Sequence, residues 1–97
     1  MENCEHCKKT PREDELVSSL TKRLNRISGQ ISGVTKMIQE NRYCRDILIQ
    51  IAAIESALKE VGYIVLEDHL LSCVVDDIKE NDTSSLKEAL EISKKLS

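Results

Sequence analysis

The 97 residues suit a single domain, and a core without Phe or Trp must be built from Ile, Leu, Val and Ala. No run approaches the roughly 18 consecutive apolar residues of a membrane span, and the first residues lack the apolar segment of a signal peptide. We therefore expect a cytoplasmic protein without a membrane partner, whose four cysteines serve as metal ligands or redox-active thiols rather than structural disulfides.

The net charge of −3 is unevenly distributed along the chain. Between Leu16 and Gln50 basic residues exceed acidic ones by four, which leaves a balance of −7 for the remainder. Because the local field acts on a partner more strongly than the total charge does, this basic segment keeps nucleic acid open as a partner.

We expect a flexible tail over residues 1–10 and a single helical domain over residues 11–97. Thr10 is a candidate N-cap, Pro11 suits the first helical position, and Glu13 completes a capping box. From there to residue 38, apolar residues recur at alternating spacings of three and four. This seven-residue repeat predicts a long helix that packs lengthwise against another helix.

A break is predicted at "ENRY", residues 40–43, and a second apolar register begins directly after it. The second register continues far enough for one helix to reach about Asp77 before "ENDTSS" interrupts it. Thr83 or Ser84 is then expected to cap a short helix through "LKEALEISKKL", whose final lysines favour the helix dipole.

The predicted fold class is all-α, with a three-helix protomer made of two long antiparallel helices and a short C-terminal helix. Each long helix carries more apolar surface than one neighbour can cover. We therefore expect the hairpin to bury its second stripe against another copy, as an antiparallel dimer.

His69 and Cys73 stand four residues apart and so share one face of the second helix. Outside the tail, Cys44 is the remaining cysteine, and at about 1.5 Å per residue a continuous helix places it roughly 37 Å from His69. The three cannot meet within one chain. If two copies of this helix pack antiparallel about a two-fold axis near Ala57 and Leu58, Cys44 lies opposite the partner's His69–Cys73 turn, which gives two sites per dimer.

Two thiolates and one imidazole at a dry helical interface suit Cu(I), whereas Zn(II) usually seeks a fourth ligand. The alternative is structural, because a cysteine on an apolar stripe is often a small buried hydrophobe and a lone histidine is often inert. Cys4, His6 and Cys7 of the N-terminal "CEHC" are an auxiliary metal or redox site, or else part of a mobile tail. A zinc finger is disfavoured because no second ligand pair follows at suitable spacing.

Three segments, "RLNRISGQISGV", "RYCRDILIQIAAIESAL" and "LEDHLLSCV", resemble the CsoR/RcnR/FrmR family of bacterial transcriptional repressors, most closely its copper-sensing branch. The resemblance spans about Leu16 to Leu96. It implies an all-helical dimer of dimers, a homotetramer without a helix-turn-helix, that releases operator DNA when Cu(I) binds. It also implies that Cys44, His69 and Cys73 hold the copper between protomers.

By the same resemblance, Tyr43 stands beside the metal ligands, and so does Glu88 if one residue is missing in the preceding loop. The DNA contacts implied by the resemblance fall on basic residues: Lys22, Arg23, Arg26, Lys36 and Lys59. Phosphate neutralisation at such residues makes binding strongly salt-dependent. This chain departs from the family pattern at Ser28, Ser32 and Glu60, where charged or basic residues are common.

Other functions remain open at this point. A persulfide or oxidant sensor would link Cys44 and Cys73 across the interface, although it leaves His69 without a role. A formaldehyde sensor would use Cys44 and the amino terminus and leaves Cys73 unexplained. A cytosolic copper buffer or chaperone would not need the basic segment. An enzyme is not expected, because no carboxylate pair or activated nucleophile emerges.

Overall fold

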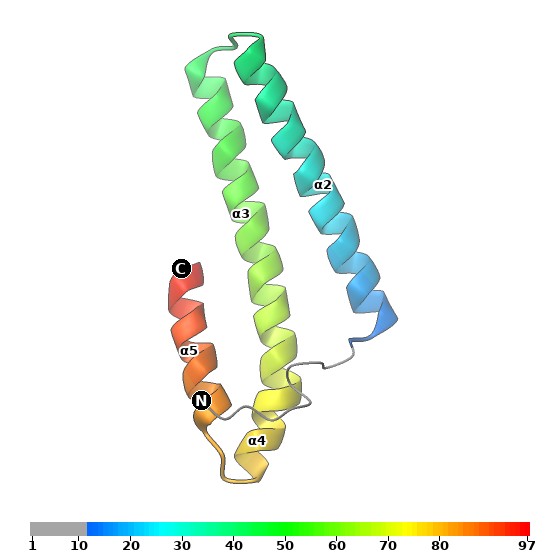
Figure 1. Cartoon of the computed structure of the whole chain (residues 1–97), viewed down its shortest axis with the longest axis vertical. Coiled ribbons are helices and arrows are strands. Elements are labelled where there is room, and N and C mark those ends of the chain that lie inside the picture. Colours follow the sequence, from blue (N-terminus) through cyan, green and yellow to red (C-terminus); the bar gives the residue numbers. More distant parts are fainter. Residues whose placement is uncertain (1–11) are drawn as a thin grey trace. The chain divides into compact units, whose positions relative to one another are not determined.

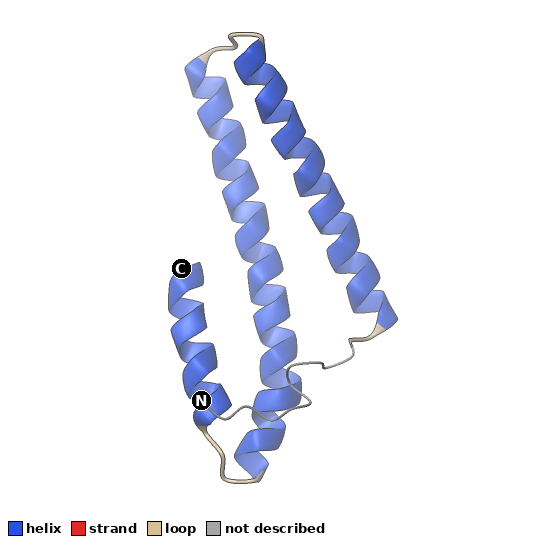
Figure 2. Cartoon of the chain, in the orientation of Figure 1, coloured by secondary structure: helices blue, strands red, loops and turns tan. Residues whose placement is uncertain are grey.

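The computed structural model describes residues 12–97, and every regular element in this part of the chain is helical (Figure 1, Figure 2). The predicted all-α class, with two long helices and a short C-terminal one, is confirmed. Two compact units are formed, Glu13–Val61 and Gly62–Ser97, the second of which includes Arg12. The elements in chain order are α2 (Asp14–Gln39), α3 (Cys44–His69), the π-helical turn η1 (Leu70–Val74), α4 (Val75–Lys79) and α5 (Ser84–Leu96).

In the unit Glu13–Val61, α2 packs antiparallel to the first part of α3 (Figure 1). Ile27 of α2 is buried against Ile54 and Val61 of α3, which are seven residues apart. Partly buried aliphatic residues extend this contact: Leu20, Val34 and Ala57. Since full burial of one such side chain stabilises the fold by roughly 1.5–3 kcal/mol, one stripe from each helix holds the hairpin together.

The second apolar stripe of each helix is exposed in the protomer. On α2 it consists of residues at intervals of seven, each 44–58 % exposed: Val17, Leu24, Ile31 and Ile38. On α3, Ile51 and Leu58 are exposed, and together with Cys44 they form a series of residues spaced seven apart. A long exposed apolar stripe marks an interaction surface. The sequence predicts that this surface packs against a second copy of the chain.

Both long helical segments end in an asparagine with left-handed backbone. Asn41 has φ 55° and Asn81 has φ 62°. After α2, the Arg42 N–H donates to the Met37 carbonyl at 2.9 Å, and the Asn41 N–H donates to the Ile38 carbonyl. The equivalent two backbone hydrogen bonds form at the end of α4. This pattern is the Schellman motif, in which Asn replaces the more usual Gly.

The helix starts differ from the predicted ones. Helix α2 begins at Asp14, and its N-cap residue Glu13 makes no side-chain capping hydrogen bond. Thr10 and Pro11, predicted to start this helix, lie outside the described residues. At α5, the side chain of Thr83 makes no capping bond. The cap comes instead from the residue before it, as described next.

Asp82 caps α5. Its Oδ1 accepts hydrogen bonds from the Ser84 backbone N–H, at 2.9 Å, and from the Ser84 hydroxyl. An aspartate whose side chain binds the backbone two residues on forms an Asx-turn, which competes well with a hydroxyl cap. Ser84 was predicted as a candidate cap of α5. It instead donates hydrogen bonds to Asp82, which is the cap.

The helix that begins at Cys44 continues without a break to Lys79, which confirms the prediction that it reaches about Asp77. The π-helical turn η1 interrupts its α-helical pattern and was not predicted. In the unit Gly62–Ser97, the buried residues are Cys73, Val74, Asp77, Ser85 and Ala89. The Ser85 hydroxyl donates to Asp77 Oδ2 at 2.7 Å, a buried hydrogen bond that ties α5 to α4. None of the helices over residues 12–97 has the length and apolar character that a membrane span requires.

Candidate metal centre and nucleic-acid interface

Cys44 is the first residue of α3, and its thiol is free and exposed. The carbonyl of the preceding residue, Tyr43, accepts hydrogen bonds from the backbone N–H groups of Asp46 and Ile47. These bonds close the first helical turn and fix the backbone that carries Cys44. The Tyr43 side chain is exposed as well, so both residues face a potential partner.

His69 is the last residue of α3, and its side chain is half-buried at a cavity of about 260 Å³. Glu88, which comes from α5, lines the same cavity. The structure thus brings together two of the residues that the family resemblance singles out. The complete lining is Arg12, Gly62, Val65, Leu66, His69, Glu88 and Ile92.

The end of α5 packs against α3 at Gly62, beside this cavity. A Cβ atom at this position would lie 2.8 Å from Leu96 Cδ2, so a larger residue there requires the flexible Leu96 side chain to shift. This packing, together with the Asp82 cap, places Glu88 on the His69 side of α5.

Arg12 is a neighbour of His69 that sequence reasoning missed. Its Nε lies 3.2 Å from Asp68 Oδ2, and its side chain lines the His69 cavity. The sequence offers no signal for this contact, because Arg12 was expected inside the first helix. Since α2 begins only at Asp14, Arg12 is available for Asp68.

Cys73 lies in η1, four residues after His69, and is 1 % exposed in the protomer. It takes part in a disulfide bond, so the expectation of thiols rather than disulfides is not met at this cysteine. Single π-helical turns inside longer helices are frequent at functional sites. The placement of His69 and Cys73 at one end of a continuous helical segment agrees with the sequence prediction. Their role as metal ligands stays a prediction at this point.

Cys44 is far from the other two predicted ligands along the same helix. It begins the 26-residue α3, whose last residue is His69, and at about 1.5 Å per residue the two ends lie roughly 37 Å apart. Within residues 12–97 of a single chain, no three His, Cys, Asp or Glu side chains are grouped so that they could hold a metal ion. Cys4, His6 and Cys7, the predicted auxiliary site, lie outside the described residues.

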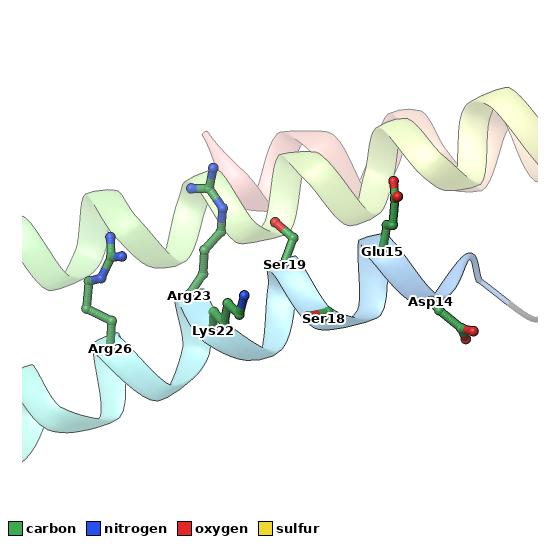
Figure 3. Close-up of a pocket in the computed structure, with 7 residues that line it drawn as sticks. All are labelled: Asp14, Glu15, Ser18, Ser19, Lys22, Arg23 and Arg26. Atoms are coloured by element: carbon green, nitrogen blue, oxygen red, sulfur yellow. The ribbon is translucent and has the colours of Figure 1, made fainter.

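Three basic residues of α2, Lys22, Arg23 and Arg26, line a groove of about 640 Å³ in the unit Glu13–Val61 (Figure 3). Figure 3 shows Arg23 and Arg26 extending from the same side of α2, and Lys22 beside them. Two acidic residues that were not predicted, Asp14 and Glu15, line the groove as well and reduce its positive charge. The remaining lining residues are Ser18 and Ser19.

Lys36 and Lys59, the other two predicted DNA contacts, lie outside this groove. Lys36 lines a separate hollow nearer the 40–43 turn, and Lys59 is exposed on α3. Arg23 Nη1 lies 3.0 Å from Oε1 of Glu60, the residue after Lys59. One predicted DNA contact is therefore held in an ion pair.

Comparison with known proteins places this chain among metal-responsive regulators. A model of the family described as "Metal-sensitive transcriptional repressor" matches residues 17–95. The chain is 46 % identical over 77 residues to the copper-sensing transcriptional repressor CsoR of Bacillus subtilis (strain 168), with 78 % of this chain and 76 % of that protein covered.

Two solved structures are similar along most of the chain. The copper-sensing repressor CsoR with Cu(I) from Geobacillus thermodenitrificans NG80-2 shares 46 % identity and a TM-score of 0.80, with 88 % of this chain and 90 % of that chain covered. The nickel-responsive transcriptional regulator InrS shares 38 % identity and a TM-score of 0.69, with 82 % and 91 % covered. The resemblance found in the sequence is confirmed, and the chain belongs to the metal-sensitive transcriptional repressor family.

Proposed function

We propose that the protein is a copper(I)-responsive transcriptional repressor, which binds operator DNA without metal and releases it when Cu(I) binds. The observation that carries the proposal is the position of Cys44 and His69 at opposite ends of one unbroken helix. Similarity to copper-sensing repressors over most of the chain supports the choice of metal.

The proposed copper site is shared between two protomers. Two antiparallel copies of α3, related by a two-fold axis near Ala57 and Leu58, bring Cys44 of one protomer opposite the His69–Cys73 turn of the other. The exposed apolar stripe that includes Leu58 gives each copy the surface for this pairing. Two antiparallel hairpins then form the dimer, and the exposed α2 stripe supports pairing of dimers into a homotetramer.

The donor set fits copper in its reduced state. In the reduced protein, Cys44 and Cys73 supply two soft thiolates and His69 an imidazole, a set that suits Cu(I). Glu88 lines the cavity beside His69. In the proposed site its carboxylate accepts a hydrogen bond from the imidazole nitrogen that does not bind metal. Such outer partners orient a ligand histidine and fix its tautomer. Tyr43, which precedes Cys44 in the chain, is the proposed outer partner on the Cys44 side of the site.

Metal capture is coupled to a change in conformation. Cys73 is buried in the protomer and disulfide-bonded, so its sulfur reaches a shared ion only if the disulfide is reduced and the packing around η1 changes. A metal that binds the changed form better shifts the protein toward that form. The same ion thereby disfavours the form whose basic residues fit DNA, which is an allosteric coupling between two sites.

The basic residues of α2 form the proposed DNA surface. Lys22 and Arg26 are exposed there, and Lys36 and Lys59 add positive charge elsewhere in the same unit. Contacts of this type neutralise phosphates and release counterions, so the affinity falls steeply as salt rises.

Titration of the reduced protein with Cu(I), while its DNA complex is followed by fluorescence anisotropy, tests the proposal. We expect Cu(I) to dissociate the complex at about one equivalent per protomer. Zn(II) at equal concentration leaves it intact, because the site lacks a fourth ligand. Persistence of the complex with Cu(I), but loss with a polysulfide, would establish the thiol-based sensor instead. The exposed Cys44 thiol is the feature that favours that second candidate.

A further inference from the structure

The ion pair between Arg23 and Glu60 sets Arg23 apart from the other basic residues of the α2 groove. Arg23 Nη1 and Glu60 Oε1 are 3.0 Å apart, and the two side chains are 40 % and 60 % exposed. In the part of the chain that the structure describes, neither Lys22 nor Arg26 forms an ion pair. The pair faces solvent, so the Arg23 guanidinium is open to an approaching phosphate.

Arg23 stands between two hollows of the unit Glu13–Val61. It lines the α2 groove with Lys22 and Arg26, where Figure 3 shows its guanidinium extending from the helix. It also lines a smaller hollow of about 150 Å³ together with Arg26, Ala57 and Glu60. Within residues 12–97, Glu60 is paired with Arg23 and not with Arg26. The guanidinium can therefore be held toward α3 by Glu60 or be drawn toward an anion in the groove.

A carboxylate and a phosphate compete for the same guanidinium N–H donors. The counterions released on binding come from the DNA, and a paired arginine must release its carboxylate before it neutralises a phosphate and displaces them. The Glu60 carboxylate therefore lowers the gain from each contact that Arg23 makes with the DNA backbone. This loss applies to any sequence, because phosphate contacts carry no sequence information.

We propose that Glu60 controls the DNA affinity of this repressor by sequestering Arg23, so that sequence-independent binding to phosphates is weakened. The inference rests on the proposed function, since it requires the α2 groove to bind DNA. Glu60 is a positioning residue in this account, because it acts through Arg23 rather than on the bases.

The test is the salt dependence of DNA binding by Glu60→Gln, measured on a duplex selected from a random library and on an unselected duplex of equal length. We expect binding to tighten on both duplexes and the log–log salt slope to steepen by about one for each Arg23 that contacts a phosphate. The advantage of the variant over the wild type then grows about fourfold, for each Arg23 that contacts a phosphate, between about 200 mM and about 50 mM salt. Exposed ion pairs add little to stability, so the variant stays folded, and its thermal melting curve verifies this.

Two further variants separate this mechanism from simpler ones. Glu55→Gln makes the same charge change on an exposed residue of α3 that has no ion pair in the described part of the chain, and we expect it to leave the slope unchanged. In an Arg23→Ala background, Glu60→Gln should have no effect on the slope.

An unchanged slope in Glu60→Gln overturns the inference. So does an equal gain in the Arg23→Ala background, which would indicate direct repulsion between Glu60 and phosphate, or an equal gain in Glu55→Gln, which would indicate net charge alone. If the metal-free wild type selects no duplex, the proposed function itself fails, and the inference fails with it. Selection by the wild type with no response to Glu60→Gln rejects the inference alone.

Discussion

The Asp82 carboxylate gives the start of α5 a dependence on pH. The Ser84 hydroxyl, and after it the Ser84 backbone N–H, hold the pKa of Asp82 below its ordinary value of 3.8. A carboxyl group whose pKa is lower in the folded chain stabilises the fold above its unfolded pKa, and this contribution is lost as the pH falls through the folded pKa. Ionised Asp82 therefore stabilises α5 at neutral pH and ceases to do so in acid.

We predict that Asp82→Asn melts below the wild type at pH 7 and that the difference disappears in acid. The asparagine amide can still accept the two hydrogen bonds but carries no charge, so it resembles the protonated aspartate. Thermal unfolding followed by circular dichroism from about pH 2 to about pH 7 measures this difference. A constant difference across that range would show that the charge of Asp82 is not what stabilises the cap.

The two Schellman motifs determine where the long helices stop. Asn81 ends the helical segment that carries His69 and Cys73, and the turn that follows returns the chain as α5 with Glu88. A left-handed backbone costs a residue with a Cβ about 1–2 kcal/mol, less for Asn and nothing for Gly. The turn therefore depends on which residue occupies position 81.

We predict that Asn81→Ala lowers the free energy of unfolding by about 1 kcal/mol, whereas Asn81→Gly changes it by less than about 0.5 kcal/mol. Urea unfolding of the two variants and the wild type provides the comparison. Equal losses in both variants would mean that contacts of the Asn81 side chain, and not the backbone conformation, stabilise the turn.

The long helices could be predicted from the sequence because aliphatic residues recur without a miss at helical spacing. Some of these residues, for example Ile27 and Ile54, lie on the buried face of the hairpin, and others, for example Leu24, form the exposed stripe. The π-helical turn η1 carries no comparable signal, because Leu70–Val74 continues the apolar pattern of an ordinary helix. The cap of α5 was assigned to the wrong residue because three adjacent side chains, from Asp82 to Ser84, can all cap a helix.

The candidate site could be predicted only in part. The distance between Cys44 and His69 follows from the rise of an α-helix, so it required no knowledge of tertiary structure. The cavity shared by His69 and Glu88 could not be derived in this way, because it depends on the turn at Asn81 and on the packing of Leu96 over Gly62. The ion pairs of Arg12 and Arg23 likewise join residues that are distant in the sequence.

At the scale of the whole molecule, the proposed metal site does not exist until two chains meet. A single α3 keeps Cys44 away from His69, and its exposed stripe offers a second copy the surface on which the ligands meet. Because the proposed site takes its ligands from two chains, Cu(I) binding measures whether the protomer interface has formed. A ligand that is missing from one chain can be supplied by another chain. In the proposed dimer, the shared site also couples metal capture to the arrangement of the subunits.

The most direct test mixes Cys44→Ala chains with His69→Ala chains, after refolding together, in the presence of a Cu(I) chelator that competes for weakly held metal. Each heterodimer keeps one site with all three ligands, so we predict that the mixture recovers about a quarter of the wild-type capacity for tight Cu(I) binding. Neither variant alone should show such binding. Failure of the mixture to recover any tight binding, with heterodimers present by mass spectrometry, would contradict a copper site shared between two protomers.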